Sequence, residues 1–219
     1  MRFTSIDVNS IEFGSYEKRA VSITPHKFQI PRMYMPFGVS GFTPAYGATK
    51  YNIDFSMKGW NEEGHYVKRF YDFLKQVEDL AIDRVLEMCQ DIFGKSMTRN
   101  ELLDCFNSNI KPASGPYDPK FRVKIDNNTT VYNINDEEIP SEIGEGLYKG
   151  FTGAALIEIG NIYFFNKKFG IVWKIVQIKV YEPQRLHGFA MLDGAGMEDE
   201  EEDGGPTDSL SGKGCQIVI

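Results

Sequence analysis

The sequence predicts a mainly β domain of the α+β class, a small barrel with one long inserted helix, followed by an acidic tail. Three observations support this class. Stretches of alternating apolar and polar residues lie before and after one long helical pattern, instead of alternating with several helices. The composition, 42% hydrophobic and 13% aromatic, is typical of a globular chain. The end of the chain is rich in acids and glycines and cannot form a core.

The charge distribution separates the expected domain, residues 1–190, from the expected disordered tail, residues 191–219. The domain carries 23 basic and 23 acidic side chains, whereas the tail carries one basic residue and eight acids. The net charge of -7 therefore belongs to the tail. Because the domain itself is neutral, its basic residues can cluster, and the acidic total does not exclude a polyanion as partner.

The first sixty residues predict short strands separated by turns. Residues 5–13 and the proline-cut stretch 19–38 have this character, because proline confines strands to edges and loops. In residues 50–57, "KYNIDFSM", Ile53 and Phe55 alternate with Asp54 and Ser56. This alternation predicts a strand with one face buried.

One long helix is predicted over residues 62–93. Asn61 is a favourable N-cap, Gly94 is a favourable C-terminal stop, and apolar residues between them recur at three- and four-residue spacing. A second, short helix is predicted by a capping box, in which Thr98 precedes Glu101 by three residues. The long helix is expected to pack one face across a sheet.

Strands return in the second half of the chain. In "KFRVKID", residues 120–126, one face is apolar and the other carries only Lys120, Arg122 and Lys124. Residues 153–183 predict a hairpin of two long strands that turns at residues 166–170.

The hairpin and the basic strand supply the residues expected to bind a nucleic acid. On the second hairpin strand, Trp173, Lys179 and Tyr181 share one parity, which we assign to the exposed side, and the valines share the other. Aromatic rings stack on unpaired bases and basic side chains contact phosphates. The predicted contacts are Lys120, Arg122, Lys124, Tyr163, Phe165, Lys167, Lys168, Trp173, Lys174, Lys179 and Tyr181.

No pattern in the sequence favours catalysis, a metal site or a cofactor. The three histidines are far apart, and the spacings typical of zinc sites, phosphate-binding loops and nucleophile elbows do not occur. Three scattered cysteines indicate reduced thiols, and the sequence has neither a secretory signal nor a run of apolar residues long enough to cross a membrane. We therefore expect a protein that is intracellular, not secreted and not bound to a membrane.

The stretch "WKIVQIKVYEPQRLHGFAML", residues 173–192, and the acidic run resemble the replicative single-stranded DNA-binding proteins of short-tailed phages and their relatives in nucleo-cytoplasmic large DNA viruses. The resemblance implies an OB-fold, a five-stranded Greek-key barrel with the helix between its third and fourth strands. It implies a role in coating single-stranded DNA during viral replication, recombination and repair, in the host nucleus or a cytoplasmic viral factory. The acidic run consists of Glu198, Asp199, Glu200, Glu201, Glu202 and Asp203.

The resemblance also assigns a role to the tail. It implies that the tail occupies the DNA groove when DNA is absent and contacts viral DNA polymerase or helicase. A polyanionic segment can imitate a phosphate backbone in this way, although a simple solubility tail is the alternative. A homodimer is left open.

Three other functions are left open by the sequence. An RNA-binding OB module would use the same stacking and phosphate contacts. A structural or protein-interaction subunit would bury the sheet aromatics against another protein. A metal-dependent nuclease would use carboxylates brought together from distant parts of the domain.

Overall fold

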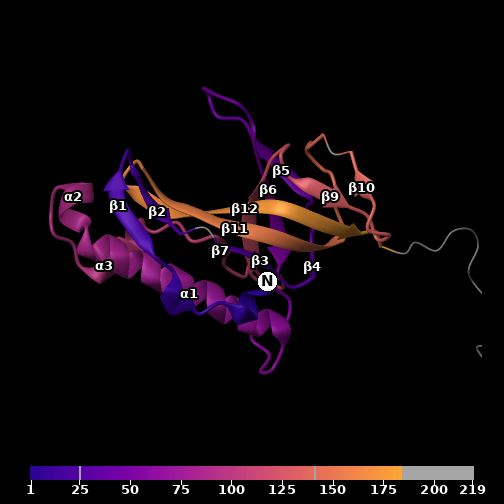
Figure 1. Cartoon of the computed structure of the whole chain (residues 1–219), viewed down its shortest axis with the longest axis horizontal. Helices are drawn as coiled ribbons and strands as arrows, with labels where there is room; N and C mark the ends of the chain where they lie inside the picture. Colours follow the sequence, from indigo (N-terminus) through magenta and orange to yellow (C-terminus); the bar gives the residue numbers. More distant parts are fainter. Residues whose placement is uncertain (25, 141, 184–219) are drawn as a thin grey trace, which may run out of the picture. The chain divides into compact units, whose positions relative to one another are not determined.

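The computed structural model describes residues 1–24, 26–140 and 142–183, and Met1–Pro183 form one compact unit (Figure 1). The predicted acidic run Glu198–Asp203 lies outside the described residues. The strands are β1 (Phe13–Glu17), β2 (Ala20–Ile23), β3 (Lys27–Gln29), β4 (Met33–Tyr34), β5 (Val39–Phe42), β6 (Lys50–Ser56), β7 (Ile110–Lys111), β8 (Lys120–Ile125), β9 (Thr130–Tyr132), β10 (Glu138–Ile139), β11 (Thr152–Phe165) and β12 (Lys168–Tyr181). The helices are α1 (Tyr66–Glu87), α2 (Cys89–Phe93) and α3 (Arg99–Cys105).

Five strands close into a barrel. β11, β4, β6, β8 and β12 pair in this order, and β11 also pairs with β12. The β8–β12 pair is parallel and the other four pairs are antiparallel. Numbered along the chain, the order around the barrel is 1-2-3-5-4, the Greek-key order of an OB-fold. The predicted mainly β class and OB-fold barrel are confirmed.

The helices are inserted between β6 and β8, the second and third barrel strands. The resemblance placed them between the third and fourth strands, and this placement is wrong. The long helix also begins four residues later than predicted, because the His65 side chain, rather than that of Asn61, accepts the hydrogen bond from the Val67 N–H. It is interrupted at Met88, which the sequence did not predict. The next helix ends at Phe93 with Gly94 as its left-handed C-cap, so the predicted stop at Gly94 is confirmed.

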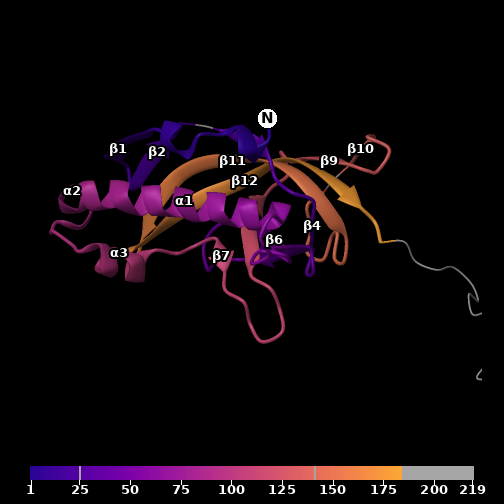
Figure 2. The same ribbon diagram turned by 90° about the horizontal axis from the view of Figure 1, so that it is seen from below.

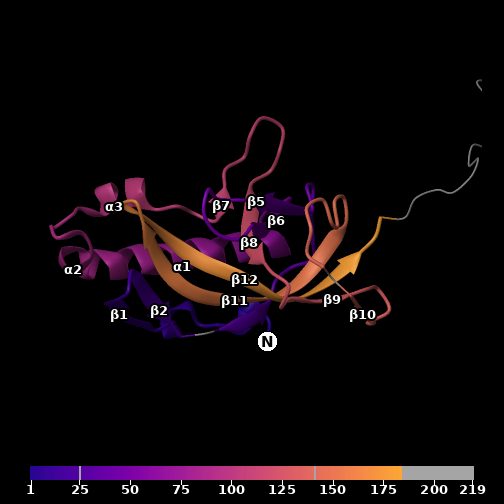
Figure 3. The same ribbon diagram turned by 90° about the horizontal axis from the view of Figure 1, so that it is seen from above.

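Helix α1 lies along the β11–β12 hairpin (Figures 2 and 3). Phe73 packs edge-on against Phe28, and Phe70 packs edge-on against Phe121, with ring centroids 5.3 and 5.5 Å apart. Both partner rings also contact Trp173. These contacts join the helix to β3 and to the barrel strands β8 and β12 through one aromatic core.

The N-terminal segment differs from the expectation. Residues 5–13, predicted as a strand, instead contain a 3₁₀ turn at Val8–Ser10, and another turn precedes it at Phe3–Ser5. The Asp7 side chain accepts a hydrogen bond from the Asn9 N–H and caps the second turn. This local bond competes with strand pairing, which explains the difference.

Candidate nucleic-acid interface

The basic strand predicted at residues 120–126 is β8, and its alternation is confirmed. Phe121, Val123 and Ile125 are fully buried, so the side chains between them point outward. Pairing adds a cation on each side, because Lys111 lies opposite Lys120 and Lys174 lies opposite Lys124. We call this set the β8 face: Lys111, Lys120, Arg122, Lys124 and Lys174.

Arg122 is held at the centre of the β8 face by a buried carboxylate. Its Nε and Nη2 donate to the two oxygens of Asp54 at 2.7 and 2.8 Å. The Asp54 side chain is 4% exposed and that of Arg122 is 45% exposed. The paired carboxylate raises the pKa of Arg122 above its ordinary value. The guanidinium is therefore fixed, and its outer edge still faces solvent.

Two lysines of the β8 face share one acid. Asp126 lies 3.7 Å from Lys124 Nζ and 3.2 Å from Lys174 Nζ. Burial on its own would raise the pKa of Asp126, but hydrogen bonds from Lys174 and from the Asn128 N–H, together with both lysine charges, lower it below the ordinary value. Asp126 therefore stays ionised and occupies one side of both ammonium groups.

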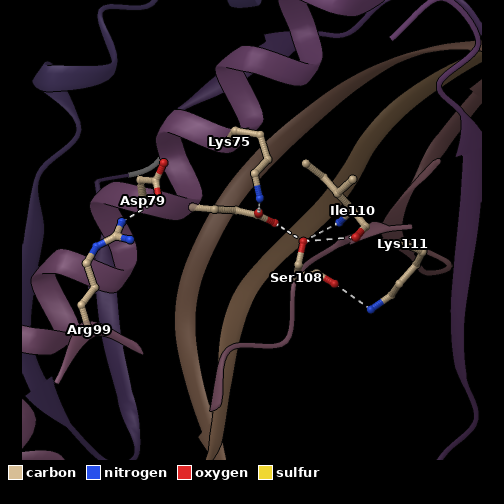
Figure 4. A network of polar contacts seen from close by, with 7 residues as sticks. Lys75, Asp79, Arg99, Ser108, Ile110 and Lys111 are labelled. Atoms are coloured by element: carbon tan, nitrogen blue, oxygen red, sulfur yellow. Dashed lines mark hydrogen bonds and ion pairs between the residues drawn. The ribbon is translucent and has the colours of Figure 1, made fainter. Parts of the chain in front are cut away.

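Lys111 is positioned by a polar network that reaches α1 (Figure 4). Its Nζ donates to the Ser108 carbonyl at 2.6 Å, and the Ser108 hydroxyl donates to buried Glu78 at 2.5 Å. Lys75 pairs with the same carboxylate at 3.0 Å. Burial, followed by the nearby Arg122 charge, lowers the pKa of Lys111. The network holds this ammonium group beside the other cations of the β8 face.

Exposed aromatic side chains gather in the connection between the first and second barrel strands. Phe37, Phe42 and Tyr46 are 50%, 65% and 94% exposed, and Tyr34 at the end of β4 is 47% exposed. The Phe37 ring lies 4.8 Å from Lys120 Nζ, beside the β8 face. The next residue must be glycine, because Gly38 has a φ of +63° and a Cβ there would clash with the Leu147 carbonyl. Another aromatic, Tyr117, is exposed on the loop after β7, which projects from the barrel (Figures 2 and 3).

These aromatics were missed by the sequence reasoning. They lie in a segment in which Pro36 and Pro44 interrupt any alternation, so strand parity assigns them no face. A usable signal was present, namely large aromatic residues in a loop rich in proline and glycine, where no core is available to bury them.

Trp173, predicted as an exposed stacking ring, is 2% exposed and belongs to the core. The predicted parity of β12 is wrong in its first half. Gln177 pairs with Leu156 and Ile175 pairs with Ile157, so Val176 is an extra residue on β12. Such a bulge reverses which residues face inward.

Four predicted residues lie at the tip of the β11–β12 hairpin. Tyr163 is half-buried and accepts a hydrogen bond from the Asn107 amide, and the Lys168 ammonium donates to the Asp104 carbonyl. Phe165 and Lys167 are exposed. Since Tyr163 is eleven residues from Thr152 on β11, at about 3.3 Å per residue the tip lies up to roughly 36 Å from the other end of the hairpin. The tip contacts the β8 face through one residue, because the same Asn107 side chain accepts a hydrogen bond from Lys111 Nζ at 3.2 Å.

The last two predicted residues, Lys179 and Tyr181, lie at that other end. Lys179 Nζ pairs with Asp136 at 2.6 Å, and the guanidinium of Arg32 covers one face of the Tyr181 ring at 3.7 Å. The predicted residues therefore divide into one buried tryptophan and three outward groups. One of these groups, Lys120, Arg122, Lys124 and Lys174, belongs to the β8 face.

Within residues 1–24, 26–140 and 142–183, no three His, Cys, Asp or Glu side chains are grouped as metal ligands. None of the helices in this part of the chain is long and apolar enough to cross a membrane.

Comparisons with known proteins connect this geometry to other chains. The model of a family described as "Family of unknown function (DUF5871)" matches residues 66–191. No curated protein sequence matches the chain. Among solved structures, the single-stranded DNA-binding protein gp2.5 of bacteriophage T7 superposes with a TM-score of 0.52 at 11% identity, over 76% of this chain and 92% of that chain.

The single-stranded DNA-binding protein of bacteriophage Enc34, in complex with single-stranded DNA, superposes with a TM-score of 0.44 at 15% identity, over 82% of this chain and 99% of that chain. The likeness to the T7 protein confirms the predicted resemblance to phage proteins at the level of the fold. The predicted likeness to proteins of large DNA viruses stays a prediction.

Proposed function

This chain belongs to the DUF5871 family, and we propose that it binds single-stranded DNA with little sequence preference along the outer face of its barrel. The observation that carries the proposal is the β8 face, five cations beside the exposed ring of Phe37. OB-folds bind oligonucleotides on their second and third strands and on the adjoining loops. Here those strands are β6 and β8, and the loop is the one that carries Phe37.

The charges of the β8 face favour a phosphate backbone. Five cations stand against two acids, Asp54 and Asp126. Arg122 is already oriented by Asp54, so little side-chain entropy is lost when a phosphate binds. Phe37 supplies a ring for base stacking, which contributes about 1–3 kcal/mol per base and tolerates any sequence.

The same proposal includes more specific roles for this protein. They are coating of DNA during replication, recombination and repair in the nucleus or a viral factory, and tail contacts with polymerase or helicase. The acidic run Glu198–Asp203 acts in this proposal as a competitor for the β8 face. A chain ending at Asp193 is expected to bind DNA more tightly than the full chain, and equal affinity would contradict the competitor role.

The proposal is tested by fluorescence anisotropy of a labelled thymidine oligonucleotide at several salt concentrations. Intrinsic tryptophan fluorescence is a poor reporter, because Trp173 is buried and Trp60 packs against the core beside Tyr71. The double variant Lys120→Met, Lys124→Met is expected to bind more weakly. The salt slope, which is the slope of log affinity against log salt concentration, is expected to be smaller in magnitude by about 1.4, at roughly 0.7 per lost phosphate contact.

A matched control removes one charge elsewhere. Lys95 follows α2, and Figure 1 shows α2 at the opposite end of the described unit from β4 and β9. Lys95→Met is therefore expected to leave binding unchanged. Equal affinities of the double variant and the wild type would refute the proposed interface. A matched RNA oligonucleotide is titrated in parallel, and tighter binding of RNA would favour the RNA-binding alternative.

A further inference from the structure

Two adjoining cavities open beside Tyr181, away from the β8 face. Their volumes are about 350 and 240 Å³, and both are lined by Gln29, Ala154 and Tyr181. Arg2 and Arg32 line the first, and Lys179 lines the second. Among the described residues that line them there is no carboxylate. Lys179 is paired with Asp136, but no ion pair joins Arg2 or Arg32 to a described acid. Since the domain as a whole is neutral, two arginines around a cavity without carboxylates indicate an anionic ligand.

Arg32 has the geometry of a prepared phosphate ligand. Its Nε donates to the Thr152 hydroxyl at 2.8 Å, and its guanidinium plane lies over the Tyr181 ring at 3.7 Å. No described residue accepts a hydrogen bond from its two Nη groups, although Arg32 lines the cavity. A guanidinium fixed by stacking and by one hydrogen bond keeps a two-donor edge for a phosphate.

The cavities are connected to the β8 face by one row of outward residues. Pairing places Lys120 beside Ser56, Ser56 beside Tyr34, Tyr34 beside Thr152, and Thr152 beside Tyr181. These four steps between neighbouring strands follow the curved wall of the barrel for about 19 Å, at roughly 4.8 Å each. Tyr34, in the middle of the row, is 47% exposed. A strand that leaves the β8 face therefore meets an exposed ring before it reaches Arg32.

We propose that Arg32, supported by Thr152 and Tyr181 and assisted by Arg2, binds a phosphodiester group of the same DNA strand. This subsite rests on the proposed function and deepens it, because it extends the strand from the β8 face across β6, β4 and β11. It also changes the role expected of Tyr181. Arg32 covers one face of that ring, so Tyr181 orients the guanidinium instead of stacking on a base.

The test compares Arg32→Met with the wild-type full chain on labelled thymidine oligonucleotides of increasing length. Short oligonucleotides that fill only the β8 face are expected to bind both proteins equally. Once the oligonucleotide is long enough to reach Arg32, the variant is expected to bind roughly tenfold more weakly, with a salt slope smaller by about 0.7. Arg32 is exposed, so the variant is expected to keep the fold, and a thermal melt checks this.

Further variants sharpen the result. Arg32→Lys keeps the charge but loses the planar guanidinium with its two parallel donors. Its affinity for long oligonucleotides is expected to lie between those of Arg32→Met and the wild type. Lys95→Met is the matched control, with no dependence on length.

Three outcomes overturn the subsite. Equal binding of Arg32→Met and wild type at every length excludes contact with Arg32, and equal weakening at every length excludes a position beyond the β8 face. Absence of binding by the wild type at any length would refute the proposed function and the subsite together, whereas the first two results leave the β8 face intact.

Discussion

β8 and β12 are neighbours in the barrel, yet alternation assigns the faces correctly on the first and only in part on the second. β8 is six residues long and pairs with β6 without interruption. β12 is fourteen residues long, and its inward set changes from Ile171, Trp173 and Ile175 to Ile178 and Val180. The difference shows that parity holds only within a segment that contains no bulge.

The partner strand has a second irregularity of the same kind. Between Ile159 and Ile162 of β11 the register shifts, and the inward positions change parity there as well. Long strands that coil around a barrel need such bulges, because extra residues increase twist and curvature. The errors in the sequence prediction therefore arise where the barrel bends.

The largest expected effect tests the first half of β12. Trp173→Ala removes a buried indole that contacts Phe28 and Phe121, and should lower the free energy of unfolding by about 3–5 kcal/mol. Lys174→Ala, the adjacent outward position, should change it by less than about 0.5 kcal/mol. Urea denaturation measures both, and similar losses for the two variants would contradict the assigned faces.

The second effect concerns the cations of β8, which the alternation treats as equivalent. Arg122→Met leaves the buried Asp54 carboxylate without its partner, and should cost about 2–3 kcal/mol of unfolding free energy. Lys124→Met, whose side chain is 46% exposed, should cost less than about 0.5 kcal/mol.

A double variant separates two explanations of this loss, the unpaired Asp54 carboxylate and the lost packing of the Arg122 alkyl chain. Asp54→Leu combined with Arg122→Met replaces the pair by apolar groups and should recover most of the lost stability in the same urea titration. If the double variant were no more stable than Arg122→Met, loss of alkyl packing by Arg122, and not the unpaired carboxylate, would explain the cost.

The sequence predicted those parts of the molecule that follow from local periodicity. β6, β8, the long hairpin, the long helix and the capping box at Thr98 all obey local rules, and each is confirmed. The gathering of Lys111 and Lys174 beside β8 depends on strand pairing, and pairing is a property of the closed barrel. The same holds for the stacking of Arg32 on Tyr181 across three strands.

The third effect compares two exposed phenylalanines, one missed and one predicted. Phe37 lies beside Lys120 of the β8 face, whereas Phe165 lies at the hairpin tip. Phe37→Ala should weaken binding of a thymidine oligonucleotide by about 1–3 kcal/mol, the contribution of one stacked base. Phe165→Ala should leave it unchanged. Anisotropy titrations measure both, and the reverse result would move the interface to the hairpin tip.

The smallest effect tests the acid that the two strands share. Asp126→Asn keeps an oxygen that can accept from the Asn128 N–H, but it releases Lys124 and Lys174 from their ion pairs. In the proposed interface each pair would compete with a DNA phosphate, so the variant should bind a thymidine oligonucleotide about two- to fivefold more tightly, as expected for a partly exposed pair. Unchanged or weaker binding in anisotropy titrations would mean that these two lysines do not contact the strand.

The pH dependence of stability gives a second measure of the same acid. The pKa of Asp126 is below its ordinary value in the folded protein, so its ion pairs stabilise the fold above the unfolded-state pKa. This contribution should be lost as the pH falls through the lower folded-state pKa. Asp126→Asn should therefore flatten the acid limb of a plot of unfolding free energy against pH. An unchanged acid limb, together with tighter DNA binding, would show that the Asp126 pairs weaken DNA binding without stabilising the barrel.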